Sequence, residues 1–453
     1  MRNEIRDASY LIWRHWQRVV ILSNPEEVSP RMAQNPIKPL VRCLLEIPSR
    51  LEEVATGYLL SLSLPAPKHT QTFASEVTGL HQTQFSRLLS DHEDLARDNL
   101  YRLARTRGHE LSENGRDLLV KGGPWRVGVI IDATLHGRSS LHVHNAQRFN
   151  HGEGFVIGHQ WTNVVLVLNG EVITLPPIPF LSKNECKRLG IAYQTEHEKI
   201  VEYLRRLNLR DLIGDHEPGE VLCLVDSGYD SKQIQKACFR KKWDLIGSLK
   251  CNRSVQSWSE GKIEPKRKWI RVDQLFRNHR KQAPWQSVRD EVKSGKRKKK
   301  RKEFRTRRLM GRLKDVHRVV SLVCSEKSKG EGRIYLVCSN LDVPLGVVIR
   351  AYRRRWLIEL FHRAAKSHLG MQDAGVRDFT SQKSHVHWVY CAYLILNALE
   401  VPTPMGISER QQWVSRRRDA GKIRDLHQLT TQYGGLRTIQ NRCHEALREE
   451  IAS

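Results

Sequence analysis

Apolar residues recur at helical spacing through the first part of the chain. The segments LIWRHWQRVV, VRCLLEI and LEEVATGYLLSLSL place them three and four positions apart, which predicts helices over residues 1 to about 60. Pro65 and Pro67 then end this pattern. The N-terminal part of the chain is therefore predicted to be helical.

Two short helical patterns, Phe73–Val77 and Gln82–Leu89, flank Gly79. This arrangement is typical of a helix-turn-helix, whose second helix enters a DNA groove. We expect its polar side chains to face DNA and its apolar ones to pack, with Gln82, Gln84 and Arg87 as candidate DNA contacts. A helical hairpin without a DNA-binding role has the same pattern and is an open alternative.

After a further helix over 93–111, the pattern changes to strands that alternate with helices. Val127–Ile131 is predicted to be a buried strand that ends at Asp132, and Val221–Val225 a second that ends before Asp226. Asn169-Gly170 predicts the turn of a hairpin between them. Helices over 196–207 and 231–242 and a strand over 244–249 complete an α/β pattern. In such folds, sites lie where strands end.

The alternation is lost from about Asn252 to Val316. Residues Lys293–Arg308 hold eleven basic residues and one acid. This run is interpreted either as a solvated loop or as a phosphate-binding segment that becomes ordered on DNA, with Lys298, Lys299 and Lys300 as candidate contacts. Two strands, 318–324 and 333–339, follow, and Ser384–Leu399 is predicted to be an apolar core helix.

The net charge narrows the class of partner, and the cysteine content narrows the kinds of metal or disulfide site that are expected. The chain of 453 residues has a formal net charge of +27, which favours a polyanionic partner, and nucleic acid is the first candidate. No apolar run is long enough to span a membrane, and no secretory signal is expected. The nine cysteines form no CxxC pair, so neither a zinc ribbon nor a disulfide framework is indicated. These features fit a reducing cytoplasm.

A stretch without proline, Ile349–Gly370, is predicted to be one helix. At about 100° per residue, Tyr352, Arg355, Glu359 and Lys366 fall on one stripe roughly 60° wide. One acid thus stands among phenol, guanidinium and ammonium groups, a set suited to a phosphate strand beside a metal-binding carboxylate. A charged surface helix is the commoner alternative, and the stripe alone does not decide between them.

Three carboxylates are candidates for a shared site: Asp132, Asp226 and Glu359. They are far apart in sequence, but a sheet and a packed helix are able to bring them together. Converging carboxylates bind hard divalent cations when a phosphate supplies further oxygens. Two such ions activate a nucleophile and stabilise the leaving oxygen in phosphoryl transfer. Each aspartate taken alone is more often a turn or helix cap.

The spacing Tyr352-x2-Arg355-x3-Glu359-x6-Lys366 resembles the signature of insertion-sequence transposases with an Asp-Asp-Glu triad. Asp226-Ser-Gly228-Tyr229 and Ile131-Asp132-Ala-Thr resemble the two aspartate motifs of that family. Ser227 departs from the pattern, since relatives often carry a basic residue there. The resemblance covers about residues 120–400.

The resemblance implies an RNase H-like catalytic core that cleaves DNA with two Mg²⁺ ions, Mn²⁺ being an alternative, and then joins the freed 3′ end to target DNA. It implies that Asp132, Asp226 and Glu359 are catalytic metal ligands and that Tyr352, Arg355 and Lys366 hold the transposon-end strand. Tyr229, in the second motif, is a further expected DNA contact. It also implies a homodimer on paired DNA ends, no membrane partner, and a bacterial, cytoplasmic and nucleoid-associated protein.

The expected division of the chain has five parts. Residues 1–118 form a helical DNA-binding domain, 119–251 and 336–400 form the core, 252–335 form a β-rich insertion, and 401–453 form a helical tail. In relatives that cut through a hairpin, an aromatic residue of the insertion stacks on a flipped base, and the sequence leaves Trp258, Trp269 and Trp285 open.

Other residues near the first aspartate are given ordinary roles. Zinc is not expected at the histidines around Asp132, and a place near the site for His136 or His159 is an open alternative. Thr134 and Arg138 contact DNA or cap a turn, and Cys223 is a buried strand residue. A nuclease on the same core without strand transfer, or an inactive DNA-binding derivative, are the alternative functions.

Overall fold

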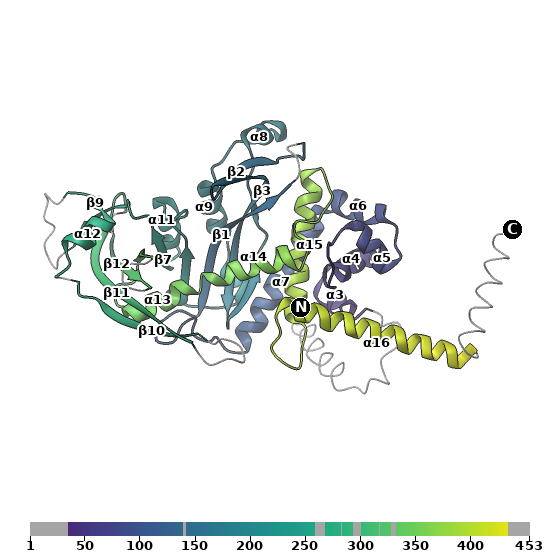
Figure 1. Ribbon diagram of the computed structural model, residues 1–453. Coiled ribbons are helices and arrows are strands. Elements are labelled where there is room, and N and C mark those ends of the chain that lie inside the picture. Colours follow the sequence, from purple (N-terminus) through teal and green to yellow (C-terminus); the bar gives the residue numbers. More distant parts are fainter. Residues whose placement is uncertain are drawn as a thin grey trace.

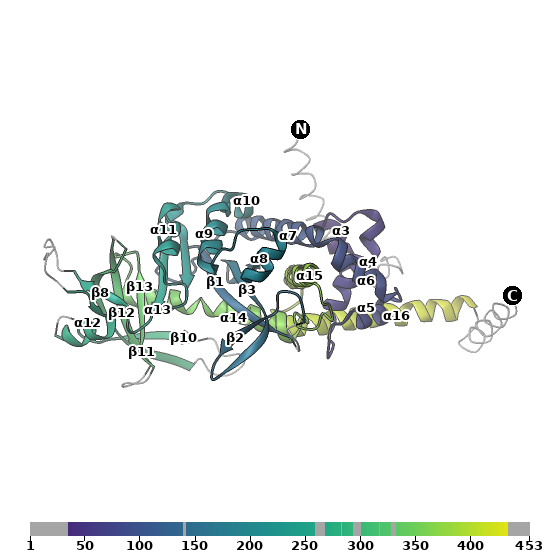
Figure 2. The same ribbon diagram turned by 90° about the horizontal axis from the view of Figure 1, so that it is seen from above.

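The computed structural model describes residues 35–433 apart from 139–141, 259–267, 282, 293–299, 317 and 328–331. The helix predicted over LIWRHWQRVV lies outside these residues. Helices at one end, a central sheet, and a β-rich region at the other end follow one another along an elongated molecule (Figures 1 and 2). The predicted mixed α/β class is confirmed.

The N-terminal helices do not form a separate core. Helices α4, α6 and α7 pack against α15, a helix from much later in the chain, and their buried side chains join one hydrophobic cluster with those of the sheet. Helix α15 is buried on nearly all sides because other elements surround it. The bounds are α3 Lys38–Leu44, α4 Ser49–Leu62, α5 Gln71–Thr78, α6 Gln82–Asp91, α7 Glu93–Glu113 and α15 Phe379–Ala398.

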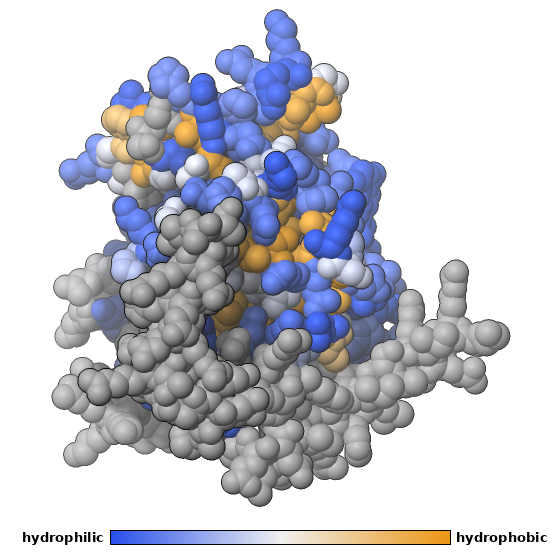
Figure 3. Space-filling view, turned by 90° about the vertical axis from the view of Figure 1, so that its right-hand side faces the viewer, coloured by the Kyte–Doolittle hydropathy of each residue, from blue (hydrophilic) through white to orange (hydrophobic). Residues whose placement is uncertain are grey.

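The predicted helix-turn-helix corresponds to α5 and α6. Thr70 caps α5, and Gly79 ends it with a left-handed φ of 77°, a conformation that glycine adopts without steric cost. In α6, Phe85, Leu88 and Leu89 are buried, while Gln82, Gln84 and Arg87 are exposed. The face of the molecule shown in Figure 3 is mostly hydrophilic, and its apolar residues lie in separate areas.

All strands described join one sheet, in the order β2-β3-β1-β6-β7-β13-β12-β11-β8-β9. Strands β1, β6 and β7 are parallel to one another, and the other neighbours are antiparallel. Strands β4 and β5 pair with β3, and β10 pairs with β11. The bounds are β1 Val127–Gly137, β2 Gln147–His151, β3 Gly154–Leu168, β4 Glu171–Thr174, β5 Ile178–Pro179, β6 Val221–Val225, β7 Asp244–Leu249, β8 Ser254–Ser257, β9 Ile270–Arg271, β10 Gln286–Val292, β11 Lys300–Leu313, β12 Val319–Glu326 and β13 Ile334–Cys338.

The hairpin predicted at Asn169-Gly170 is confirmed. Strands β3 and β4 pair from Val165↔Thr174 to Leu168↔Glu171, and both turn residues have positive φ, 50° and 81°. Positive φ at both central positions matches the right-handed twist of the strands that the turn joins.

The remaining helices cover the sheet and form the tail: α8 Lys183–Leu189, α9 Glu196–Arg206, α10 Leu209–Ile213, α11 Lys232–Arg240, α12 Val272–Asn278, α13 Leu345–Arg353, α14 Trp356–Ser367 and α16 Ile407–Tyr433. In Figure 1, α16 extends away from the body of the molecule. Along the described part of the chain, no helix combines the length and apolar composition needed to cross a bilayer.

The β-rich region continues the core sheet. Strand β13 pairs with β7 of the core on one side and with β12 on the other. The expected boundary between residues 335 and 336 therefore falls inside a strand. The basic run Lys293–Arg308, interpreted as a loop, is a strand from Lys300 onward, where β11 pairs with β10 and β12. The loop interpretation is wrong for this part because strand pairing with distant segments determines its conformation.

Candidate active site

The register in which β1 pairs with β6 places the two aspartates side by side. Strands β1 and β6 pair in parallel as far as Ile131↔Val225, and the next residues along the two strands are Asp132 and Asp226. The prediction that the first strand ends at Asp132 is wrong, since β1 continues to Gly137 through its pairing with β3. Asp132 thus lies inside a strand, at the position where its parallel partner ends.

Asp226 begins a tight turn that brings the chain from β6 toward α11. Its Oδ1 accepts a hydrogen bond from the Gly228 amide at 2.8 Å, and its carbonyl accepts one from the Tyr229 amide at 3.2 Å. Such Asx turns are a common use of aspartate.

Glu359 is supplied by α14, which packs against β1 (Figure 1). The single helix predicted over Ile349–Gly370 is wrong in one respect, because the structure has two helices, α13 and α14, joined at Arg354 and Arg355. The Arg355 and Ile358 amides donate to carbonyls three residues back, at 3.0 and 3.2 Å, which tightens the chain locally. No proline or glycine marks this junction.

Arg355 links two of the three acids. Its Nη1 lies 3.2 Å from Asp132 Oδ2, and its Nη2 lies 2.5 Å from Glu359 Oε1. The guanidinium is the bridge that brings the strand carboxylate and the helix carboxylate together. Tyr352, in the last turn of α13, and Lys366, in the last turn of α14, are half-buried.

The pKa values reflect this crowding of charge. The pKa of Asp132 is raised to about 6, chiefly by burial; Arg355 opposes this shift, and Asp226 and Glu359 add to it. Burial acts to lower the pKa of Arg355, but the combined influence of Tyr352, Asp132 and Glu359 outweighs it, so the pKa is raised. Burial lowers the pKa of Lys366. Because Asp226 and Glu359 both act on the pKa of Asp132, the three acids are close enough to form one electrostatic site.

The donor set fits a hard divalent cation, because carboxylate oxygens are the ligands that Mg²⁺ and Mn²⁺ prefer. Within the described residues, however, no three His, Cys, Asp or Glu side chains are gathered closely enough to hold a metal ion. The Arg355 guanidinium lies between Asp132 and Glu359, so the three carboxylates have to come closer together to share an ion.

Other predicted site residues lie elsewhere. Tyr229 is buried, with its hydroxyl donated to Glu196 Oε1 at 2.8 Å, so the structure does not present it at the surface. Gln82, Gln84 and Arg87 are exposed on α6, whereas the acids belong to β1, to the turn after β6 and to α14. Lys300 begins β11, and Lys298 and Lys299 lie outside the described residues.

The three tryptophans of the insertion differ in their surroundings. Arg305 and Arg307 stack on Trp285, and Arg312 stacks on Trp258, whereas Trp269 is 44% exposed. Two of the histidines after Asp132 lie in the core. His136 and His159 are buried, burial lowers the pKa of each, and they pack near Gln382 and Phe379 of α15.

The remaining residues near the first aspartate are also accounted for. Thr134 is buried, and Arg138 donates to the Ala374 carbonyl. Cys223 is a buried residue of β6, as predicted.

The sequence did not predict a series of buried, hydrogen-bonded polar side chains near Glu359. The Tyr390 hydroxyl donates to Asn163 Oδ1 at 2.6 Å, and Asn163 Nδ2 lies 3.0 Å from His362 Nε2. Asn163 pairs with Asp132 across the sheet, and burial lowers the pKa of His362 to about 3, so His362 is a neutral acceptor. The position of His362 one turn after Glu359 was the sequence feature that could have pointed to this series. Its partner, Asn163, is brought near only by the fold.

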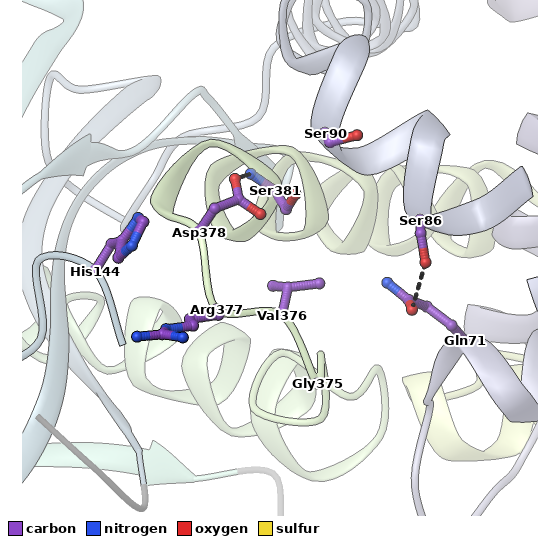
Figure 4. A pocket seen from close by; sticks show the side chains of 9 residues that line it. All are labelled: Gln71, Ser86, Ser90, His144, Gly375, Val376, Arg377, Asp378 and Ser381. Atoms are coloured by element: carbon purple, nitrogen blue, oxygen red, sulfur yellow. Dashed lines mark hydrogen bonds between the residues drawn. The ribbon is translucent and has the colours of Figure 1, made fainter. Parts of the chain in front are cut away.

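A cavity of about 480 Å³ lies between the helix-turn-helix and the start of α15 (Figure 4). Gln71 and Ser86 line one side and are hydrogen-bonded at 3.0 Å, while Arg377 and Asp378 line the other. None of the three acids lines it, so it is separate from the candidate active site.

Comparison with known proteins identifies the domain. No curated protein matches the sequence significantly. Residues 194–395 match the family model described as Transposase DDE domain, a range that includes Asp226 and Glu359 and begins after Asp132. DDE transposases are polynucleotidyl transferases that act on DNA and in general use divalent metal ions. Asp132, inside β1, and Asp226, directly after the parallel strand β6, thus lie side by side, and the chain contains a DDE transposase domain over residues 194–395.

Proposed function

We propose that this transposase binds the terminal inverted repeats of an insertion sequence and catalyses Mg²⁺-dependent DNA cleavage and strand transfer. The observation that supports this most is the pairing Ile131↔Val225, which aligns Asp132 with Asp226, together with the Arg355 bridge from Asp132 to Glu359. Three carboxylates from distant parts of the sequence meet in a strongly basic protein.

An RNase H-like core is the fold that we assign to this site. The strand order β4-β3-β1-β6-β7, with an antiparallel β4-β3-β1 meander followed by two strands parallel to β1, supports this assignment. The first aspartate lies on the central strand of this set and the glutamate on a helix packed against it.

Asp132, Asp226 and Glu359 are the proposed ligands of two Mg²⁺ ions, which when bound supply an activated water and neutralise charge on the leaving oxygen. Water attacks the phosphorus, the bond to the 3′ oxygen breaks, and a free 3′-OH results. That 3′-OH then attacks a phosphorus of target DNA in the same site, and the bond from this phosphorus to the target's own 3′ oxygen breaks and leaves a 3′-OH. Tyr352, Arg355 and Lys366 hold the transferred strand, and two copies of the chain pair the two ends.

Arg355 has two roles in this scheme. Without DNA, it neutralises Asp132 and Glu359, which stabilises a site that otherwise holds only negative charge. Bound cations would supply this neutralisation instead, and the guanidinium would then be available for a phosphate, for which its planar fork is suited.

The helix-turn-helix is the proposed reader of the repeat sequence. Gln84→Ala is expected to weaken binding to the terminal repeat by about 1–3 kcal/mol and to leave binding to unrelated DNA unchanged, because glutamine reads base edges. Arg87→Ala is expected to weaken both, because arginine contacts phosphates. Fluorescence anisotropy with repeat and scrambled duplexes measures this. Gln194→Ala, an exposed glutamine before α9, is the control, and equal losses on both duplexes for Gln84→Ala would contradict the assignment.

The basic run is the proposed phosphate-binding surface of the insertion. The triple substitution Lys298→Gln, Lys299→Gln and Lys300→Gln is expected to reduce the slope of log affinity against log salt by roughly 2–3, since each phosphate contact contributes about 0.9. Substitution is preferable to deletion, which would remove part of β11. Arg205, Arg206 and Arg210, whose side chains are 73%, 75% and 74% exposed, provide a triple-glutamine control with the same change of charge. Equal slopes for the two triple variants would show that the run does not contact DNA.

A further inference from the structure

The turn that carries Asp226 is held from outside by the first residues of α9. Glu196 Oε1 accepts a hydrogen bond from the Tyr229 hydroxyl at 2.8 Å and another from the Thr162 hydroxyl of β3 at 2.5 Å. The carboxylate of Glu196 thus connects the turn to the strand that pairs with β1.

The neighbouring residue on α9 contacts the same turn. His197 Nε2 lies 2.9 Å from the Gly228 carbonyl oxygen. A carbonyl only accepts, so this ring nitrogen carries the proton and donates it. The His197 and Tyr229 rings also lie against each other, with centroids 6.1 Å apart. Two consecutive residues of α9 therefore contact two consecutive residues of the turn.

The start of α9 is itself firmly fixed. Thr195 caps the helix, and its side chain and that of Glu198 form a reciprocal capping box. Glu196 and His197 are the two residues between these caps, so their backbone is defined by the first helical turn. They are attached to a rigid element and not to a loop.

Tyr229 is placed to transmit this constraint to the acids. It is 6% exposed, and its pKa is raised by burial first, then by Glu196, Asp132 and Asp226. The hydroxyl therefore stays protonated and donates. Within the turn, the Asp226 carboxylate is held by the Gly228 amide, whose own carbonyl is the one that His197 contacts. Movement of Gly228 or Tyr229 would displace the Asp226 carboxylate from its position beside Asp132.

We propose that Glu196 and His197 are positioning residues for Asp226, acting through Tyr229 and Gly228. The inference rests on the proposed role of Asp226 in metal-dependent cleavage. It gives Tyr229 a role other than the DNA contact expected from its motif, and it adds two residues that no motif contains. Groups that orient metal ligands in this way commonly change metal affinity or activity by 10–100-fold when removed.

The test uses the full-length protein, MgCl₂ and a duplex that bears the terminal repeat flanking the coding sequence. Glu196→Ala, His197→Ala and Tyr229→Phe are each expected to slow single-turnover cleavage roughly 10–100-fold and to raise the half-saturating Mg²⁺ concentration several-fold. The duplex affinity measured in EDTA is expected to stay within about twofold, since the turn is not a proposed DNA contact. Glu196→Gln keeps an oxygen acceptor for Tyr229 and is expected to recover most of the rate.

Controls separate this inference from the function on which it rests. Glu202→Ala removes an acid from the same helix that pairs with Arg205 and Arg206 but does not contact the turn, and it is expected to cleave like the parent protein. If Asp226→Asn is inactive while Glu196→Ala and Tyr229→Phe keep the parental rate and Mg²⁺ dependence, the positioning role is overturned and the triad stands. A slower Glu196→Ala with unchanged Mg²⁺ dependence and a lower unfolding temperature also overturns it, since that result describes a stabilising residue. Cleavage by Asp226→Asn overturns the triad itself.

Discussion

Asp226→Asn is expected to remove Mg²⁺-dependent cleavage while leaving binding to the terminal repeat intact. The asparagine has the same shape and keeps an oxygen acceptor for the Gly228 amide, so the turn should persist. It lacks the negative charge that a shared cation requires. A loss of at least about 10³-fold in rate, equivalent to about 4 kcal/mol in the barrier, is expected. Gel analysis of a labelled repeat duplex with MgCl₂ measures the cleavage, and a mobility shift in EDTA measures the binding.

The matched control for that experiment is Asp215→Asn. The Asp215 side chain is 99% exposed and pairs only distantly with Arg210, at 3.8 Å, so its neutralisation changes the net charge equally without touching the site. Cleavage by Asp226→Asn at the rate of Asp215→Asn would exclude Asp226 as a metal ligand.

Arg355→Gln is expected to make the stability of the metal-free protein more sensitive to pH. The pKa of Asp132 is raised to about 6 in the folded protein, above the ordinary value of 3.8, mainly by burial. Between these two values the folded state keeps a proton that the unfolded state has released, so this group contributes less stability as the pH rises. Arg355 opposes the shift, and its removal therefore extends the loss to higher pH.

Thermal unfolding in EDTA at pH 5, 7 and 8 measures this effect. The fall in unfolding temperature from pH 5 to pH 8 should be larger for Arg355→Gln than for the parent protein, and added Mg²⁺ should reverse part of it. Arg350→Gln serves as the control, because Arg350 donates to the Lys121 carbonyl and not to an acid. Parallel pH curves for Arg355→Gln and the parent protein would show that the bridge is not what neutralises the acids.

Local sequence patterns were sufficient to predict the features that depend on residues close together in the chain. The Asn169-Gly170 hairpin, the strand Val221–Val225 and the two helices around Gly79 were all predictable, because turn residues and apolar spacing encode them directly. The mixed α/β class followed from the same alternation. The three acids were found by their positions after apolar runs and on a polar helix stripe.

Features that depend on distant partners were not predictable. Strand β1 passes through Asp132 because β3 continues to pair with it, and Lys300–Leu313 is a strand because β12 lies beside it. Arg355, expected to hold DNA, is paired with two acids, one of them on β1. Tyr229 is buried because Glu196, 33 residues earlier, accepts its hydroxyl. No local pattern encodes such contacts.

The packing of the N-terminal helices on α15 has a consequence for synthesis of the chain. Tyr58 of α4 donates its buried hydroxyl toward His385 of α15 at 2.7 Å, across 327 residues of sequence. At roughly 5–20 residues per second, a ribosome needs about 15–65 s to make that stretch. During this time the nascent helix-turn-helix lacks the surface on which it finally rests. The helix pair α5–α6, which is the proposed DNA-reading part, is thus made early but completed late, when α14 with Glu359 has already been translated.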